Sequence, residues 1–318
     1  MYLPKPPILG SLTPVTRLLF SILLVISCFA ITFFIGMLLA GPIFGVNAIN
    51  IMSLLGDYNN PKAVMVLQYL QVLQSFGLFI FPALLAGFFF ERSATGYLLL
   101  NKGSRWQIYL VTLVLMFVAL PFINEMVSLN EMMKLPGYLK GMEDWMKSAE
   151  AEATRLTETF MKMPTPGAFL FNMVMIALLP AIGEELLFRG LLQRLLKDWL
   201  KNVHAAIFIS AFFFSAMHMQ FYGFIPRMML GVLFGYLFYW SNSIWVPVFA
   251  HFINNGAVVI IAYLGQRGIV SGDYENFGST DNLILILASM AMTGASLWLI
   301  YRLKTRNPAV SDFSDNPG

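Results

Sequence analysis

The sequence Leu178-Leu-Pro-Ala-Ile-Gly-Glu-Glu-Leu-Leu-Phe-Arg189 ends a long apolar run with two adjacent carboxylates and an arginine. Ionisable side chains are costly inside a bilayer, and those that occur there usually serve a function. A chain that keeps Glu184 and Glu185 in such a setting must surround them with partners from other helices. These two residues are therefore our first candidates for a functional site.

The composition indicates an all-α membrane protein. Of the 318 residues, 58% are hydrophobic and only 12% are charged, whereas a soluble domain carries about 25% charged residues. Repeated apolar runs of about 20 residues are long enough to cross a bilayer as helices. The net charge of +3 is too small to indicate nucleic acid binding, and the one cysteine, Cys28, cannot form a disulfide framework.

Eight candidate spans follow a short proline-rich lead. They cover roughly residues 15–41, 63–90, 106–127, 166–188 (running on to about 198), 203–221, 224–240, 244–264 and 282–301. Basic residues gather on alternate loops and near both termini, namely Lys5, Arg17, Arg92, Lys102, Arg105, Arg194, Lys197, Lys201, Arg302, Lys304 and Arg306. The positive-inside rule then places both termini in the cytoplasm. We expect one polytopic domain, 1–318, in a bacterial-type cytoplasmic membrane.

The long segment 128–165 falls on the outer side of this arrangement. Its hydrophobic positions between Met142 and Phe160 recur mostly three or four residues apart, which predicts an amphipathic helix. We expect this helix to lie on the outer interface or to cap the bundle, and a role in gating substrate entry remains open. The tail 302–318 is short and polar.

Helix spacing tests whether the ionisable groups can meet. Glu184 and Glu185 are the acids that remain within a span, and His218 and His251 are the histidines placed deep in spans. If spans four and five turn near Lys201, Glu184 and His218 each lie roughly 25 Å from that turn. His251 lies about 12–15 Å from the turn before its own span. The depths agree if the first hairpin projects about 10 Å further into the cytoplasm.

Local spacing separates the two acids. Glu185 and Arg189 are i,i+4 on one helix and can form an ion pair, whereas Glu184 is rotated by about 100° and is freer to act as a base or ligand. Pro180 removes the backbone hydrogen bond to Ile176 and is expected to kink the helix just before the pair.

Two chemistries remain open for Glu184, His218 and His251. One glutamate and two histidines can bind a tetrahedral divalent metal such as zinc with one open position. The same residues without a metal can hold and deprotonate a water molecule. Asn254 and Asn255 share a helix face with His251, so an amide can act beside the imidazole.

Three motifs occur in order between Glu184 and Asn255. They read Glu184-Glu-Leu-Leu-Phe-Arg189, Phe214-Ser-Ala-Met-His218 and His251-Phe-Ile-Asn-Asn255. Together they resemble the CAAX protease and bacteriocin-processing (CPBP, or Abi) family of intramembrane proteases. The motif-bearing core spans about 166–264, and the eight-helix fold of that family agrees with the number of predicted spans.

The resemblance implies an endopeptidase that hydrolyses a peptide bond of a membrane-associated protein or peptide, in a site open to the cytosol. It implies that Glu184 activates the water with help from His218, and that Glu185 and Arg189 support them. It also implies that His251 and Asn255 stabilise the oxyanion. Members of the family are described both as metalloproteases and as glutamate enzymes without a catalytic metal, so a metal held by Glu184, His218 and His251 stays open.

Two other functions remain compatible with the sequence. One is a non-catalytic membrane protein of the same fold, such as an immunity or scaffold protein, whose effect would survive the loss of Glu184 and His218. The other is a proton-coupled transporter, because carboxylate–histidine chains also relay protons. The sequence lacks the paired Gly/Pro-broken helices of inverted repeats that would favour the transporter.

Overall fold

A computed structural model describes residues 7–46, 55–133, 135–270 and 277–305. Within these residues the chain folds into helices and turns without any strand. Lys5, Arg306 and residues 306–318 of the predicted tail lie outside the described residues.

The helices follow one another in the predicted order. They are α1 (Pro14–Phe44), α3 (Pro61–Gln74), η2 (Ser75–Ile80), α4 (Phe81–Glu91), α5 (Ala94–Tyr97), α6 (Trp106–Val118), α7 (Leu120–Glu131), η3 (Gly137–Leu139) and α8 (Lys140–Phe160). They continue with α9 (Pro166–Asn172), η4 (Met173–Leu178), α10 (Leu179–Glu185), η5 (Leu186–Gln193), α11 (Arg194–Leu200), α12 (Val203–Ala216), α13 (Phe224–Ser241), α14 (Trp245–Gln266) and α15 (Leu283–Thr305). Several of these elements join end to end, so that α3 to α4 and α9 to α11 each form one long helix.

Length and hydropathy support a membrane protein, although they do not confirm eight spans. Five of the described helices are long and apolar enough to cross a bilayer, and a sixth is added if α6 and α7, bent by 45°, count as one. The helices α12 and α13 do not reach this combination of length and hydropathy. The all-α membrane fold is thus confirmed, but its exact number of spans is not.

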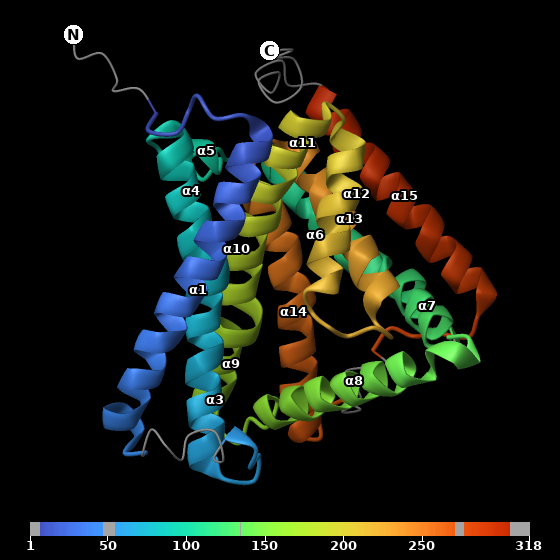
Figure 1. Cartoon of the computed structure of the whole chain (residues 1–318). Helices are drawn as coiled ribbons and strands as arrows, with labels where there is room; N and C mark the ends of the chain where they lie inside the picture. The colour runs from blue at the N-terminus through green and yellow to red at the C-terminus, as the bar shows by residue number, and fades with distance from the viewer. Residues whose placement is uncertain (1–6, 47–54, 134, 271–276, 306–318) are drawn as a thin grey trace.

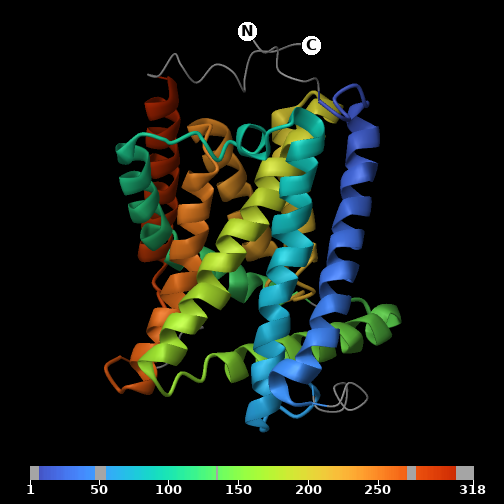
Figure 2. The same cartoon turned by 90° about the vertical axis from the view of Figure 1, so that its left-hand side faces the viewer.

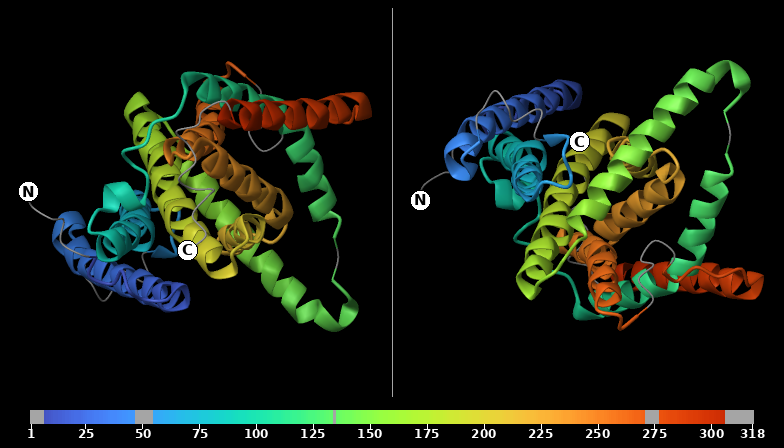
Figure 3. Two further views of the ribbon diagram at one scale, coloured as in Figure 1. Left: turned by 90° about the horizontal axis from the view of Figure 1, so that it is seen from above. Right: turned by 90° about the horizontal axis from the view of Figure 1, so that it is seen from below.

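The long helices stand side by side, and α8 crosses one end of them (Figures 1 and 2). Seen along the bundle, α8 runs from α9 toward α7, while α1 and α15 lie on opposite sides (Figure 3). The start of α1 and the end of α15 lie at the end of the bundle away from α8 (Figure 1). The predicted amphipathic segment therefore forms a helix that covers one end of the molecule.

The long helix that carries the acidic pair departs from regular α geometry on both sides of it. The π-helical segments η4 and η5 lie directly before and after α10. Pro180 has no N–H to donate to Ile176 and its ring would clash with that carbonyl, which accounts for the irregular turn before it. Wide turns of this kind often mark functional sites.

A glycine lets a second irregular helix approach the acidic pair. A Cβ atom at Gly183 would lie only 3.0 Å from Phe79 Cβ and 3.4 Å from the Ser75 carbonyl oxygen. The close packing of η2 against α10 therefore requires the absence of a side chain at Gly183. This contact packs the core residue Phe79 against the helix turn that carries Glu184.

Candidate active site

Glu185, Arg189 and His251 form a fully buried charged cluster. Glu185 Oε1 lies 2.9 Å from Arg189 Nη1 and 2.9 Å from His251 Nδ1. Arg189 also donates through Nη2 to the Gly231 carbonyl at 3.0 Å, and its guanidinium lies 4.5 Å from the centre of the Phe214 ring. The Glu185–Arg189 pair predicted from the i,i+4 spacing is confirmed, and His251 on α14 is an additional partner.

The partners of His251 determine which ring nitrogen carries the hydrogen. An ionised carboxylate only accepts hydrogen bonds, so the neighbouring Nδ1 must donate. In the neutral ring, Nε2 is then unprotonated and available as an acceptor or a ligand. The cluster thus holds the imidazole of α14 in one tautomer and one orientation.

Glu184 and His218 face each other across a short gap. His218 Nδ1 lies 2.8 Å from the Phe214 carbonyl oxygen and must donate to it, which leaves Nε2 as an acceptor in the neutral ring. This Nε2 is 3.9 Å from Glu184 Oε2, too far for a direct hydrogen bond. Within the described chain, Glu184 Oε2 is buried and has no hydrogen-bond partner. One water that donates a hydrogen to each acceptor would fit this separation.

His218 lies in a turn and not within a helix. We expected a span to residue 221, but α12 ends at Ala216. The turn is held from α7, where the buried Asn130 donates to the Phe221 carbonyl at 3.0 Å and accepts from the Ile225 amide at 2.8 Å. The His218 side chain keeps 29% of its exposure, which gives it more freedom than a residue locked inside a helix.

Asn255 takes the place of the hydrogen bond that Pro180 cannot make. Its amide Nδ2 donates to the Ile176 carbonyl at 3.2 Å, which is the carbonyl that a regular helix would pair with residue 180. Its Oδ1 accepts from Asn254 Nδ2 at 3.1 Å. Asn255 therefore ties α14 to the kinked helix, and its second amide hydrogen has no acceptor among the described residues.

Because Asn255 donates to the Ile176 carbonyl in place of residue 180, the effects of substitutions at positions 180 and 255 on stability should depend on each other. Replacing Asn255 by alanine should cost about 1–3 kcal/mol of stability, because it leaves a carbonyl without its donor. In a Pro180→Ala background the restored N–H can pair with Ile176, so the same substitution should cost less. Unfolding of the four proteins in detergent measures this difference, and an equal cost in both backgrounds would contradict the pairing.

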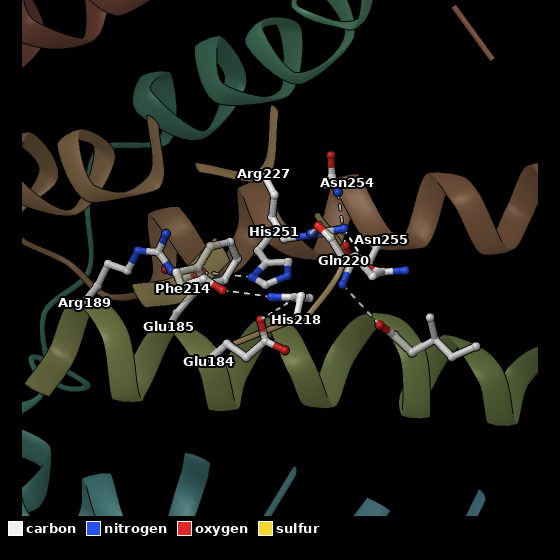
Figure 4. Close-up of polar contacts among 11 residues, drawn as sticks. Glu184, Glu185, Arg189, Phe214, His218, Gln220, Arg227, His251, Asn254 and Asn255 are labelled. Atoms are coloured by element: carbon white, nitrogen blue, oxygen red, sulfur yellow. Dashed lines mark hydrogen bonds and ion pairs between the residues drawn. The ribbon is translucent and has the colours of Figure 1, made fainter. Parts of the chain in front are cut away.

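A cavity of about 370 Å³ opens beside these groups. It is lined by apolar residues from α7, α12 and α13 and by five polar side chains, His218, Arg227, His251, Asn254 and Asn255. Figure 4 shows side chains from α10, α14, α13 and the turn after α12 directed toward one another. A hollow of this size can accommodate a short segment of peptide.

Residues 166–257 match the Rce1-like family, the type II CAAX prenyl endopeptidases. The match confirms the resemblance predicted from the three motifs, because all of them lie within it. The uncharacterised protein YpbD of Bacillus subtilis (strain 168) is 30% identical over 86 residues, which is 26% of this chain and 41% of that protein. The chain thus aligns with less than half of this relative's length. No solved structure matches.

The segment that matches the Rce1-like family places five of the six predicted site residues in two groups, with the sixth, Asn255, at the cavity wall. Glu185, Arg189 and His251 make up the buried cluster. Glu184 pairs with His218 across the gap, and Asn255 lies at the cavity wall. The depths worked out from helix spacing agree with this placement for Glu184 and His218.

Glu184, His218 and His251 are side chains of the kinds that bind divalent metals. Both imidazoles are fixed through Nδ1 to an acceptor, a pattern that often orients metal-binding histidines. Even so, within the described residues no three His, Cys, Asp or Glu side chains form a group that could hold a metal ion. As placed, Glu184, His218 and His251 do not form such a group, and a metal held by these three residues stays a prediction.

Two residues of the site escaped sequence reasoning. Arg227 on α13 lines the cavity, and Gln220 in the turn holds its guanidinium. The signal that could have revealed Arg227 is its position in the apolar run 224–240, where an arginine is as costly as an acid.

Proposed function

We propose that this chain is an intramembrane endopeptidase that hydrolyses a peptide bond of a membrane-associated protein or peptide. The observation that carries the proposal is the pair of acceptors, Glu184 Oε2 and His218 Nε2, that face each other 3.9 Å apart. They lie beside a cavity to which His218 itself contributes. A water held between two acceptors presents its oxygen lone pairs to a substrate carbonyl in that cavity.

The proposed reaction uses this water as the nucleophile. As its oxygen attacks the carbonyl carbon, Glu184 accepts one proton and His218 keeps the water in place through Nε2. The carbonyl oxygen becomes an oxyanion that needs hydrogen-bond donors. When the C–N bond breaks, Glu184 returns the proton to the leaving nitrogen, so that one product ends in a carboxylate and the other begins with an amine.

The buried cluster supports this chemistry without taking part in proton transfer. Arg189 already has its carboxylate partner in Glu185, so Glu184 does not share that ion pair. His251 is fixed through Nδ1 to Glu185 and contributes to the cavity wall with the rest of its ring. In this proposal the cluster orients His251, while Glu184 remains the base.

We also propose that the end of the bundle away from α8 faces the cytoplasm of a bacterial-type cell. Arg92 caps the C-terminus of α4 and Lys201 that of α11, which begins at Arg194, and basic residues favour the cytoplasmic side. Labelling of single cysteines, one placed in α8 and one after α15, measures this orientation in intact cells. If an impermeant reagent labelled only the cysteine after α15, the orientation would be opposite to the one proposed.

Isotope incorporation tests the proposed reaction. The purified protein, given internally quenched peptides with apolar residues around the bond in H₂¹⁸O, should release fragments with one ¹⁸O in the new carboxylate. Mass spectrometry detects the label. Absence of any cleavage across the peptide set and in proteoliposomes would overturn the proposal.

A further inference from the structure

Arg227 is a cation in an apolar helix that lacks an ion-pair partner in the described part of the chain. No described carboxylate lies within ion-pair distance of it. Its two terminal nitrogens instead donate to one residue, Nη1 to the Gln220 carbonyl at 3.2 Å and Nη2 to Gln220 Oε1 at 2.8 Å. The carboxylates of Glu150 and Glu184 act on it electrostatically, but neither lies within ion-pair distance, so an arginine kept in this place needs a further explanation.

The guanidinium of Arg227 has more unused hydrogen-bond donors than the other polar side chains of the cavity wall. It is always protonated and has five N–H groups and no acceptor, of which the described contacts use two. The two imidazoles at the same wall are different, because both donate through Nδ1 and present Nε2 as an acceptor when neutral. The amides of Asn254 and Asn255 each already donate once.

Gln220 fixes where these free donors point. Two hydrogen bonds, one to the backbone carbonyl and one to the side chain of Gln220, hold the plane of a guanidinium better than a single bond. Figure 4 shows Arg227 extending from α13 to Gln220 beside His251. Glu150, Glu184 and His218 are its electrostatic neighbours. A fixed cation in the wall of the cavity to which His218 also contributes is an arrangement that can stabilise developing negative charge.

We propose that Arg227 is a further catalytic residue, which donates to the carbonyl oxygen of the scissile bond and stabilises the oxyanion formed by water attack. The inference rests on the proposed function and adds a donor that the three motifs do not contain. Gln220 is then a positioning residue, which acts through Arg227.

The kinetics of Arg227 variants test this role. Arg227→Gln should lower kcat about 10²–10³-fold, the usual loss for one oxyanion donor, with KM changed little because the contact forms in the transition state. Arg227→Lys keeps the positive charge but cannot make both hydrogen bonds to Gln220 in the same geometry. Its kcat should therefore lie between those of the wild type and Arg227→Gln. Gln220→Ala, which removes the Oε1 bond and leaves the guanidinium, should lower kcat far less than Arg227→Gln.

Chemical rescue provides a readout that a structural role would not move. Methylguanidine added to Arg227→Ala should restore part of kcat in a saturable way and should not help Glu184→Gln. Thermal unfolding of each variant identifies any that fail to fold. If Arg227→Gln or Arg227→Ala is among them, the kcat of folded Arg227→Lys tests the catalytic role: it should be lower than that of the wild type, and an unchanged kcat would contradict the role.

The following results would contradict the role of Arg227 as an oxyanion donor. A rise in KM at unchanged kcat would make Arg227 a binding group for a substrate carboxylate. An equal loss in Gln220→Ala and Arg227→Gln, without rescue, would make it a support for the turn after α12. A wild type that cleaves while Arg227→Gln is equally active refutes this inference alone, whereas an inactive wild type refutes the proposed function together with it.

Discussion

Glu184→Gln should nearly abolish the proposed peptide hydrolysis and leave the fold intact. Glutamine has nearly the same shape but cannot accept the proton of the attacking water, and a positioned general base contributes about 10²–10⁴-fold to a rate. We therefore expect kcat to fall by about that factor with little change in KM. Initial rates with a quenched peptide measure the loss.

Stability should change in the opposite direction to activity. Glu184 is 8% exposed and its Oε2 has no hydrogen-bond partner in the described chain, so an ionised form there is costly. A neutral amide removes that cost, and the melting temperature should hold or rise. Glu158→Gln, a change on the exposed face of α8, is the matched control and should alter neither quantity. A Glu184→Gln protein that is fully active would end the proposed mechanism, and one that is unfolded would make the residue structural.

Sequence spacing predicted part of the site well because depth depends only on helix rise. Glu184 and His218 were assigned to one depth by counting residues from a turn, and their side chains do face each other. The pairing of Glu185 with Arg189 depends on a single helical turn and was equally accessible. Depth along a helix and the spacing of residues on one helix do not depend on how that helix packs against another.

The partner of His251 could not be predicted in this way. Counting gives the depth of a side chain but not its direction around the helix axis. The π-helical segments η4 and η5 change that direction on both sides of the acidic pair, because their i→i+5 pattern differs from the regular turn. As a result His251 bonds to Glu185.

Two further features depend on contacts between distant parts of the chain. The end of α12 before His218 is set by the turn that Asn130 holds from α7, and the apolar run 203–221 gives no sign of it. Pro180 did reveal a free carbonyl at Ile176, yet the donor that fills it, Asn255, lies on α14. Its amide could be assigned to that carbonyl only once the helices were placed.

Arg189→Met should have the largest effect on stability. Arg189 is 1% exposed and Glu185 is 0% exposed, so removing the cation leaves a buried carboxylate with only His251 beside it. Breaking a buried pair on one side typically costs about 3–5 kcal/mol. Methionine fills much of the volume near the Phe214 ring, so the loss reflects the missing charge more than a cavity. Chemical unfolding in mild detergent measures it.

The double variant Glu185→Gln/Arg189→Met separates charge from packing. If the cost of Arg189→Met comes from an uncompensated carboxylate, neutralising Glu185 as well should recover a large part of the lost stability. Glutamine Oε1 can still accept from His251 Nδ1, so the imidazole keeps its tautomer and orientation. If the losses of unfolding free energy in the two single variants simply add in the double variant, the two side chains stabilise the protein independently. The buried cluster would then be stabilised by packing and not by charge pairing.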